Sequence, residues 1–251
     1  MTRSSGECVH SLRSCAAPDR YRGLVHPHDH PVWTSLTGDH AHLALRQGNA
    51  ARYGSGISGF AAVDDVDCPE HFFDLAALVA PGETVAIVTL DRDLEATPGF
   101  TVQFRGVGHQ LLATEVVGEA STRARVLTVA DVPAMVDLVG RTKPGPFTER
   151  TIELGHYVGI FDDNQLVAMA GQRFTTDVGH EISAVCTDPE FRSKGLAREL
   201  ISHLVGVDAA AGRTSFLHVA ETNTGAHALY TSMGFLERRR VCFVGLVRTP
   251  D

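Results

Sequence analysis

The residues with the clearest chemical use lie in one turn, where a predicted strand over 181–187 leads into an amphipathic helix that begins at Gly195. The first backbone N–H groups of a helix have no acceptor within it, and the positive end of the helix dipole lies behind them, so phosphate groups bind well there. Gly195 has no Cβ that would block a phosphate, and the cations of Arg192 and Lys194 lie beside it. The turn is therefore predicted to hold a pyrophosphate, with Arg192, Ser193, Lys194, Gly195, Leu196 and Ala197 around it.

A second informative segment follows at residues 223–235. Asn223 is a residue type that caps helices, and Gly234 suits the left-handed position that ends one, so the two positions bracket a short helix over 226–233. Tyr230 comes seven residues after Asn223, about two helical turns, so both side chains face the same side. The segment therefore presents an amide and a phenol together.

The two segments together resemble a known family. Arg192-x-x-Gly195-x-Ala197 resembles the Q/R-x-x-G-x-G/A motif of the GNAT acyltransferases, which bind acetyl-CoA, and residues 223–235 are similar to that family's next segment, N-x-x-A-x-x-L-Y-x-x-x-G-F. The two motifs stand in the family's order and separation, and the resemblance covers about residues 124–248. It implies the GNAT fold, in the branch whose N-terminal half is a partial GNAT-like unit. It also implies an N-acetyltransferase that passes the acetyl group of acetyl-CoA to an amine by direct attack in a ternary complex.

The resemblance further implies roles for individual residues. In the family two strands splay apart around the pantetheine arm; here these would be 181–187 and 214–220, with main-chain groups of Val185, Cys186 and Thr187 on the pantetheine and the thioester carbonyl. Tyr230 would give a proton to the departing CoA thiolate, because a phenol with a pKa near 10 is protonated at neutral pH. Glu181 would take the proton of the amine, and Asn223, Ala226 and Tyr230 would contact the cofactor. Three plainer interpretations stay open: a core tyrosine, a solvated glutamate at a strand start, and an asparagine that only caps its helix.

These segments need a scaffold, and the hydrophobic pattern from residue 125 onward predicts one. It indicates strands near 126–128, 157–161, 166–172, 181–187, 214–220 and 235–247, and helices over 131–141, 195–207 and 226–233. The helix over 195–207 has two apolar series that step by four residues and form one broad apolar face. The order β-α-β-β-β-α-β-α-β is that of an α/β protein with a mixed α+β sheet. We expect a disordered arm at 1–22, a partial GNAT-like domain at 23–120 and a catalytic domain at 124–251.

Other motifs receive plainer interpretations. Residues 54–59 read G-x-G-x-x-G, but 45–53 do not look like the apolar strand that a dinucleotide fold requires, so a loop is predicted and a nicotinamide oxidoreductase is a remote alternative. A second match to the phosphate motif, at 103–108, is set aside because no Pro-bounded strand precedes it. Cys186 is expected to be a buried strand cysteine rather than a covalent nucleophile. The histidines between positions 26 and 42 are expected to be solvated, and we expect no metal.

The composition limits the remaining possibilities. The chain has 251 residues, with 22 Lys+Arg against 30 Asp+Glu and a net charge of -8, which argues against a nucleic-acid partner. No apolar run reaches the roughly 18 residues that a membrane helix needs, and no secretory signal is visible, so we expect a cytoplasmic protein without a membrane partner. We expect a small-molecule or peptide amine as the acceptor, and a homodimer is a further expectation; the net charge is a poor guide to whether the amine is cationic. The main alternative is a non-catalytic CoA-binding or interaction protein whose N-terminal half covers the acceptor pocket.

Overall fold

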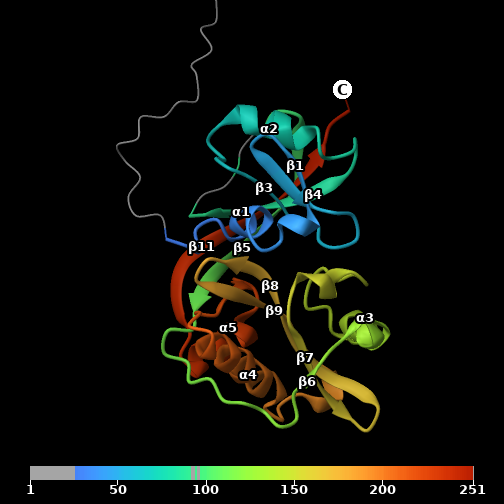
Figure 1. Ribbon diagram of the computed structural model, residues 1–251, viewed down its shortest axis with the longest axis vertical. Coiled ribbons are helices and arrows are strands. Elements are labelled where there is room, and N and C mark those ends of the chain that lie inside the picture. The colour runs from blue at the N-terminus through green and yellow to red at the C-terminus, as the bar shows by residue number, and fades with distance from the viewer. Residues whose placement is uncertain (1–25, 92–93, 95–96, 251) are drawn as a thin grey trace, which may run out of the picture.

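The helices and strands follow one another as Figure 1 shows, in a computed structural model that describes residues 26–91, 94 and 97–250. The first part of the chain contains α1 (Pro31–Thr37), β1 (Ala44–Gln47), β2 (Ala50–Tyr53), β3 (Ala61–Val63), α2 (Pro69–Ala76), β4 (Thr84–Leu90) and β5 (Phe100–Leu112). The second part contains β6 (Arg125–Val126), α3 (Val132–Thr142), β7 (Tyr157–Asp162), β8 (Gln165–Thr176), β9 (Gly179–Thr187), α4 (Leu196–Ala210), β10 (Phe216–Ala220), α5 (Thr224–Met233) and β11 (Leu236–Arg248). The predicted arm at 1–22 lies outside the described residues.

Eight strands form the main sheet, in the order β4-β11-β5-β10-β9-β8-β7-β6. β9 and β10 pair in parallel and the other neighbours pair antiparallel, so the sheet is mixed, as predicted. From β6 onward the elements follow the predicted order β-α-β-β-β-α-β-α-β. A parallel pair needs a crossover connection, and α4 supplies it between β9 and β10. This connection brings the start of α4 close to the carboxyl end of β9.

Strands from both halves of the sequence meet in this sheet. β5 lies between β10 and β11, and β4 pairs with β11 at the edge. In Figure 1, β11 runs from the side of α5 up to the part of the molecule that holds α2 and the small sheet β1-β2-β3. The division into 23–120 and 124–251 stays a prediction, since one sheet contains strands from both ranges.

The apolar face of α4 fixes the start of that helix. Leu196, Leu200 and Leu204 are buried, as the first predicted four-residue series requires; of the second series Ile201 and Val205 are buried and Ala197 is half-buried. The buried side chains belong to one core cluster with side chains of the sheet. Each fully buried Leu or Ile side chain stabilises a fold by roughly 1.5–3 kcal/mol. The helix start is therefore held in place by packing further along the helix.

Residues 54–59 form a loop, as predicted. β2, directly before them, is buried but contains Arg52, which pairs with Glu83, so it is not the apolar strand of a dinucleotide fold. The element that follows is β3, which pairs antiparallel with β2, whereas a dinucleotide-binding turn leads into a helix. The second phosphate-like match, at 103–108, lies inside strand β5. Neither sequence begins a helix.

Two of the N-terminal histidines differ from the expectation of solvated side chains. His28 and His40 are only 1% and 5% exposed. His28 hydrogen-bonds Thr176 and stacks on Phe216, and His40 hydrogen-bonds Tyr53. Burial lowers the pKa of each imidazole to about 4, so both are neutral core partners at neutral pH. Among the described residues, no three His, Cys, Asp or Glu side chains gather closely enough to hold a metal ion.

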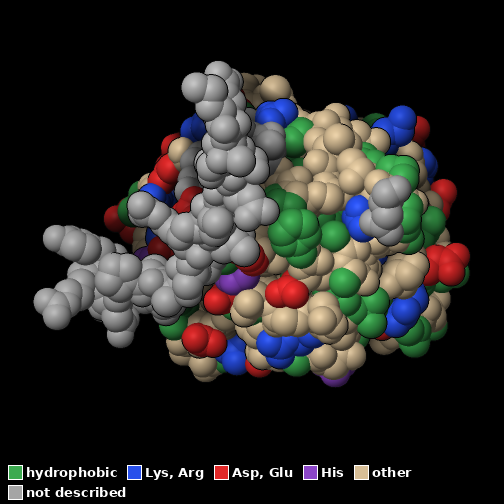
Figure 2. Space-filling model, turned by 90° about the horizontal axis from the view of Figure 1, so that it is seen from above, with side chains coloured by type: hydrophobic (Ala, Val, Ile, Leu, Met, Phe, Trp, Pro, Cys, Tyr) green, Lys and Arg blue, Asp and Glu red, His purple; other side chains and the backbone are tan. Residues whose placement is uncertain are grey.

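The surface carries both signs of charge. On the face shown in Figure 2, Lys and Arg side chains are interspersed with Asp and Glu side chains. In the part of the chain that the structure describes, no helix has the length and apolar character needed to cross a bilayer.

Candidate active site

β9 and β10 are paired at one end and separate at the other. Their parallel ladder ends after two residue pairs, the second of which is Leu217–Ile182. Beyond this pair β9 continues to Thr187 and β10 to Ala220. Both free stretches line a cavity of about 600 Å3. The two strands that the sequence assigned to a splayed pair therefore do separate, and the space between them is hollow.

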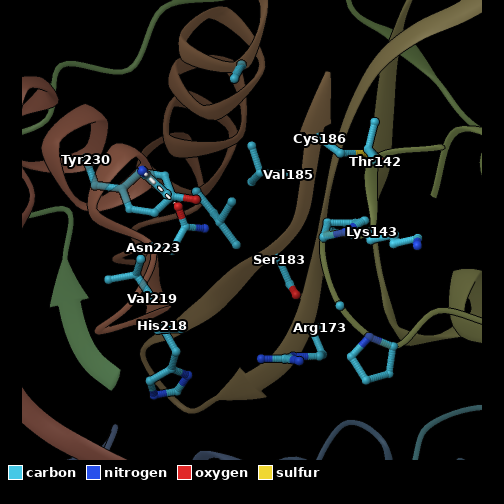
Figure 3. A pocket seen from close by; sticks show the side chains of 18 of the residues that line it. Thr142, Lys143, Arg173, Ser183, Val185, Cys186, His218, Val219, Asn223 and Tyr230 are labelled. Atoms are coloured by element: carbon cyan, nitrogen blue, oxygen red, sulfur yellow. Dashed lines mark hydrogen bonds between the residues drawn. The ribbon is translucent and has the colours of Figure 1, made fainter. Parts of the chain in front are cut away.

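The cavity has two chemically different ends (Figure 3). At one end, Val185 of β9 faces Tyr230 and Asn223, which come from α5 and its N-cap. Arg173 and His218 lie together at the other end. We call the first the turn end, because the predicted phosphate turn adjoins it, and the second the arginine end.

A bulge in β9 shapes the turn end. Ala184 has a φ of 52°, in the left-handed region that residues other than glycine rarely adopt. The ladder between β8 and β9 shifts register between Met169 and Gly171, opposite this residue, as it does at a bulge. Ala184 and Val185 therefore fall outside the regular ladder, and both line the cavity. Their main-chain groups are available to a bound molecule.

The predicted phosphate turn is built from left-handed backbone. Ser193 has a φ of 62° and Gly195 one of 78°, and α4 begins directly afterwards. Among the described residues no side chain caps this helix start, and a Cβ on Gly195 would meet nothing within 4 Å. The space around the first N–H groups of α4 is thus open, which is the property that a pyrophosphate site requires.

The two cations of the turn take different positions. Arg192 is exposed and lines the cavity. Lys194 is also exposed, and its Nζ lies 4.2 Å from the centre of the Phe191 ring, in a cation–π contact. Positive charge therefore surrounds the start of α4, and part of it borders the cavity.

Asn223 and Tyr230 take the positions expected from their spacing. The Oδ1 of Asn223 accepts a hydrogen bond of 3.2 Å from the backbone N–H of Ala226, which confirms the N-cap, although α5 begins at Thr224 and not at 226. Tyr230 is 8% exposed and is both a member of the main core cluster and a wall of the cavity. Burial raises the pKa of its phenol to about 12, so the phenol is protonated at neutral pH. The interpretation as a core residue and the interpretation as a site residue are both compatible with this position.

Glu181 is fully buried, so the interpretation of a solvated charge at a strand start is wrong. Its carboxylate accepts two hydrogen bonds from Arg173, of 2.8 and 2.6 Å, and lies 2.7 Å from Nδ1 of His218. Burial alone would raise the pKa of Glu181, but the charge of Arg173 and the hydrogen bonds from Arg173 and His218 outweigh burial and lower it to about 2. These two partners line the cavity. The role of Glu181 as the base stays a prediction, and direct transfer of a proton to it requires that a partner give way.

A network behind His218 has no signal in the sequence. Nε2 of Gln110, on β5, lies 3.1 Å from Nε2 of His218 and donates to the carbonyl oxygen of His28 at 2.9 Å. Oε1 of Gln110 accepts a hydrogen bond of 2.6 Å from Arg238, which fixes the orientation of the amide. Because the amide nitrogen can only donate, Nε2 of His218 accepts and its Nδ1 carries the hydrogen that faces Glu181. The imidazole is therefore held in one tautomer.

The arginine end is enclosed by residues that the sequence did not single out. Phe60, Ala86 and Phe104 come from the first part of the chain, and Phe243 comes from β11. Residues 142–146, after α3, close another side. These segments share no motif, because the pairing of β5 and β4 with β11 brings most of them together. A sequence signal for this wall would have required the strand pairing to be known first.

Cys186 is a free, buried thiol, as predicted. Burial raises its pKa to about 11, so the thiol is neutral at physiological pH. A neutral, buried thiol is a poor nucleophile, which agrees with the expectation of direct transfer without an acyl-enzyme.

Comparisons with known proteins point in the same direction. Residues 157–244 match the family model described as FR47-like protein. The ribosomal protein bS18-alanine N-acetyltransferase of Escherichia coli K12 is 31% identical over 116 residues, which are 44% of this chain and 78% of that protein. Among solved structures, a GNAT-family acetyltransferase from Novosphingobium aromaticivorans is 32% identical with a TM-score of 0.82, over 90% of this chain and 100% of that chain. A GCN5-related N-acetyltransferase from Kribbella flavida, 16% identical with a TM-score of 0.57 over 89% of this chain and 96% of that chain, shares the fold.

The similar proteins and the geometry of the cavity point to the same family. The E. coli enzyme is matched over most of its length, and the Novosphingobium structure over all of it. The separated strands, the open helix start and the buried phenol occur together in this chain, in the order that the two motifs predict. The chain therefore belongs to the GNAT family of N-acetyltransferases.

Proposed function

We propose that acetyl transfer takes place in the cavity between β9 and β10, with acetyl-CoA at the turn end and the amine at the arginine end. In this assignment the pyrophosphate binds residues 192–197, and the pantetheine arm lies along Val185, Cys186 and Thr187, with Asn223 and Ala226 on its other side. The uncapped start of α4 supports the first part, and the separation of the two strands supports the second. A cavity of about 600 Å3 is in the range of small-molecule sites.

The proposed reaction is substitution at the thioester carbonyl. The amine nitrogen attacks the carbonyl carbon, a C–N bond forms, and the carbonyl oxygen carries negative charge until the C–S bond breaks. Main-chain N–H groups at the bulge of Ala184 and Val185 are assigned to that oxygen, because donors fixed in advance stabilise a charge that develops in the transition state. Holding both reactants in one cavity supplies the orientation that the direct attack requires.

Tyr230 is assigned to the departing thiolate. Its phenol has a pKa of about 12, so it keeps its proton throughout the neutral range until a thiolate forms beside it. A general acid in such a position accelerates a reaction by roughly 100- to 10,000-fold.

Glu181 is assigned to the acceptor side of the reaction. As an ion-pair partner it holds Arg173 and His218 against the cavity, and its low pKa supports this role at neutral pH. As the base it would take the amine proton after giving up one of its three hydrogen bonds. The first role is compatible with the geometry as it stands, and the second is kept as a prediction.

The acceptor is proposed to be the amine of a small molecule or peptide. The E. coli relative acts, by its name, on an alanine of ribosomal protein bS18. A non-catalytic CoA-binding role is not favoured, because the relatives are named acetyltransferases and the cavity continues past the turn end to the arginine end. A homodimer and a cytoplasmic location stay predictions.

The observation that carries the proposal is the uncapped start of α4 beside the gap between β9 and β10. The test is the release of free CoA thiol from acetyl-CoA by the purified chain with a panel of primary amines, with the acetylated product identified by mass spectrometry. We expect thiol and product in equal amounts. Binding of acetyl-CoA without thiol release across the whole panel would contradict the proposal.

A further inference from the structure

The charged side chains that line the cavity are all cations, although the chain as a whole is negative. The chain has a net charge of -8. Among the described residues that line the cavity, the charged side chains are Lys143, Arg173 and Arg192, and neither Asp nor Glu occurs. Arg192 adjoins the phosphate turn, so Arg173 and Lys143 remain at the far side. A cavity walled in this way does not attract an acceptor with several positive charges.

The guanidinium of Arg173 is only partly used by its protein partners. Nε and one Nη bind the carboxylate of Glu181 at 2.8 and 2.6 Å. The guanidinium carbon lies 4.7 Å from the centre of the Phe60 ring and 4.6 Å from that of Phe174, and the two ring centres are only 5.1 Å apart, so the rings pack beside each other against the guanidinium. The other Nη has no hydrogen-bond partner among the described residues, while Arg173 borders the cavity. This Nη is accessible from the cavity, and a guanidinium N–H makes a strong hydrogen bond to a ligand oxygen, so the edge suits a carboxylate or carbonyl group.

The nearest carboxylate, that of Glu181, does not fill the place of a ligand oxygen at the free Nη of Arg173. Glu181 is fully buried, and its oxygens already face Arg173 and His218. Nε2 of His218 faces Gln110, and the amide of Gln110 is held by Arg238. The ionisable groups around the arginine end are thus tied to one another, and the free edge of Arg173 is the polar group that remains for a ligand. Beside it, Ser183 lines the cavity with a hydroxyl, and Figure 3 shows this side chain directed towards Arg173.

We propose that the acceptor is a monoamine that carries a carboxylate or carbonyl oxygen close to its amine, and that Arg173 binds this oxygen with help from Ser183. The apolar remainder of the acceptor packs against Phe60, Phe104 and Phe243. Polyamines and other multiply charged amines are excluded by the same walls. The inference rests on the proposed function, because it needs the amine to occupy the arginine end.

The test compares matched trios of amines built on alanine, leucine and phenylalanine. Each trio contains the free amino acid, its amide and the amine that lacks the carboxyl carbon, and spermidine is added as a polycation. Rates are measured as thiol release from acetyl-CoA at neutral pH and are expressed per concentration of unprotonated amine, so that basicity does not decide the order and spermidine stays a polycation. We expect the oxygen-bearing members to exceed the plain amine by about 10-fold or more in kcat/KM, since a hydrogen bond to a charged group has that worth. A higher rate for the acid than for the amide identifies a carboxylate, and the reverse identifies a carbonyl.

Two variants test whether Arg173 and Ser183 bind the acceptor oxygen. Arg173→Lys keeps the charge but loses the free Nη, so it is expected to lower kcat/KM for the oxygen-bearing acceptors by about 10-fold more than it lowers kcat/KM for the plain amine. Ser183→Ala, a milder change, is expected to lower the same rates less. Equal rates within every trio of the wild type, or spermidine as the best acceptor, would overturn the inference even if Arg173→Lys failed to fold. Thiol release with other primary amines but with no member of any trio would also overturn it. Acetyl-CoA binding without thiol release for any amine, or no acetyl-CoA binding at all, would overturn the proposed function instead.

Discussion

The turn end and the arginine end of the cavity differ in how they are made. The turn end is built on two backbone features, a bulge at Ala184 and a helix start after Gly195, with the side chains of Asn223 and Tyr230 beside them. The arginine end consists of side chains from separate parts of the chain, among them Phe104, Arg173 and Phe243. A site made of backbone suits one invariant group, which in our proposal is the diphosphate and pantetheine arm of acetyl-CoA. A site made of dispersed side chains can change its specificity one residue at a time.

The largest expected effect is at the turn end. In Gly195→Glu a carboxylate would occupy the phosphate position, and the loss of two or more charge-assisted hydrogen bonds should weaken CoA binding by about 100-fold or more. The matched control is Gly212→Glu. Gly212 has a φ of 70° against 78° at Gly195, and in both cases a Cβ would meet nothing within 4 Å, so the two variants share the backbone strain and the added charge. Calorimetry with CoA should show binding by Gly212→Glu and none by Gly195→Glu; equal affinities would remove residues 192–197 from the site.

Tyr230→Phe should separate chemistry from binding. Removing the hydroxyl takes away the proton donor for the thiolate, so kcat should fall by roughly 100-fold or more while the affinity for acetyl-CoA stays near that of wild type. Tyr53→Phe is the control. The Tyr53 hydroxyl makes a hydrogen bond of 2.9 Å with His40, and Tyr53 does not line the cavity. The loss of this hydroxyl should affect stability and not kcat. An unchanged kcat in Tyr230→Phe would leave this residue with a core role alone.

Glu181→Gln should test the ion pair at the arginine end by its effect on the free energy of unfolding. The variant leaves the Arg173 charge buried without its partner, so the free energy of unfolding at neutral pH should fall by about 3 kcal/mol. The pKa of Glu181 is about 2 in the fold against 4.5 as its ordinary value, so the carboxylate stabilises the fold above pH 4.5 and this contribution is lost as the pH falls towards 2. Urea unfolding at several pH values should show a difference between wild type and variant that is constant near neutrality and shrinks in that acidic window.

The control for this experiment is Glu237→Gln, whose carboxylate is 48% exposed beside His109. A surface pair contributes about 1 kcal/mol or less, so this variant should be nearly as stable as wild type. A difference between Glu181→Gln and wild type that did not change with acidification would contradict the assigned ion pair.

Cys186→Ala should have the smallest effect on turnover. The thiol has a pKa of about 11 because it is buried, and the predicted contacts of residue 186 with pantetheine come from its main chain. Thiol release should therefore stay close to the wild-type rate, and alkylation of Cys186 at neutral pH should be slow. A large loss of turnover in Cys186→Ala, together with an acetylated Cys186 in mass spectra of the wild type, would indicate an acyl-enzyme.

The turn end was predictable from the sequence because its parts are contiguous. Residues 181–197 contain the strand, the turn and the helix start, and each leaves a local signal: apolar periodicity, a proline, a glycine and two cations. The helices α3 and α4 and the strand order from β6 onward were predicted for the same reason. The bulge at Ala184 left no such signal, since a left-handed φ at an alanine is imposed by the sheet and not by the residue type.

The arginine end was not predictable, because its residues meet only through long-range pairing. Gln110 and His218 come together across the β5–β10 ladder, and Glu181, expected on the strand start as a solvated charge or a base, is buried by Arg173 from β8. The buried His28 and His40 were missed because loop histidines near prolines have no periodicity that would reveal a core position. For residues on strands that are far apart in the sequence, the spacing along the chain does not predict which side chains will be in contact.

The most direct test of the account is a crystal structure of the chain with acetyl-CoA. We predict the diphosphate against the backbone N–H groups that follow Gly195, the pantetheine between β9 and β10, and the thioester between Val185 and Tyr230. A diphosphate bound elsewhere, with the start of α4 left to solvent, would contradict the assignment of the cavity and with it the division into a turn end and an arginine end.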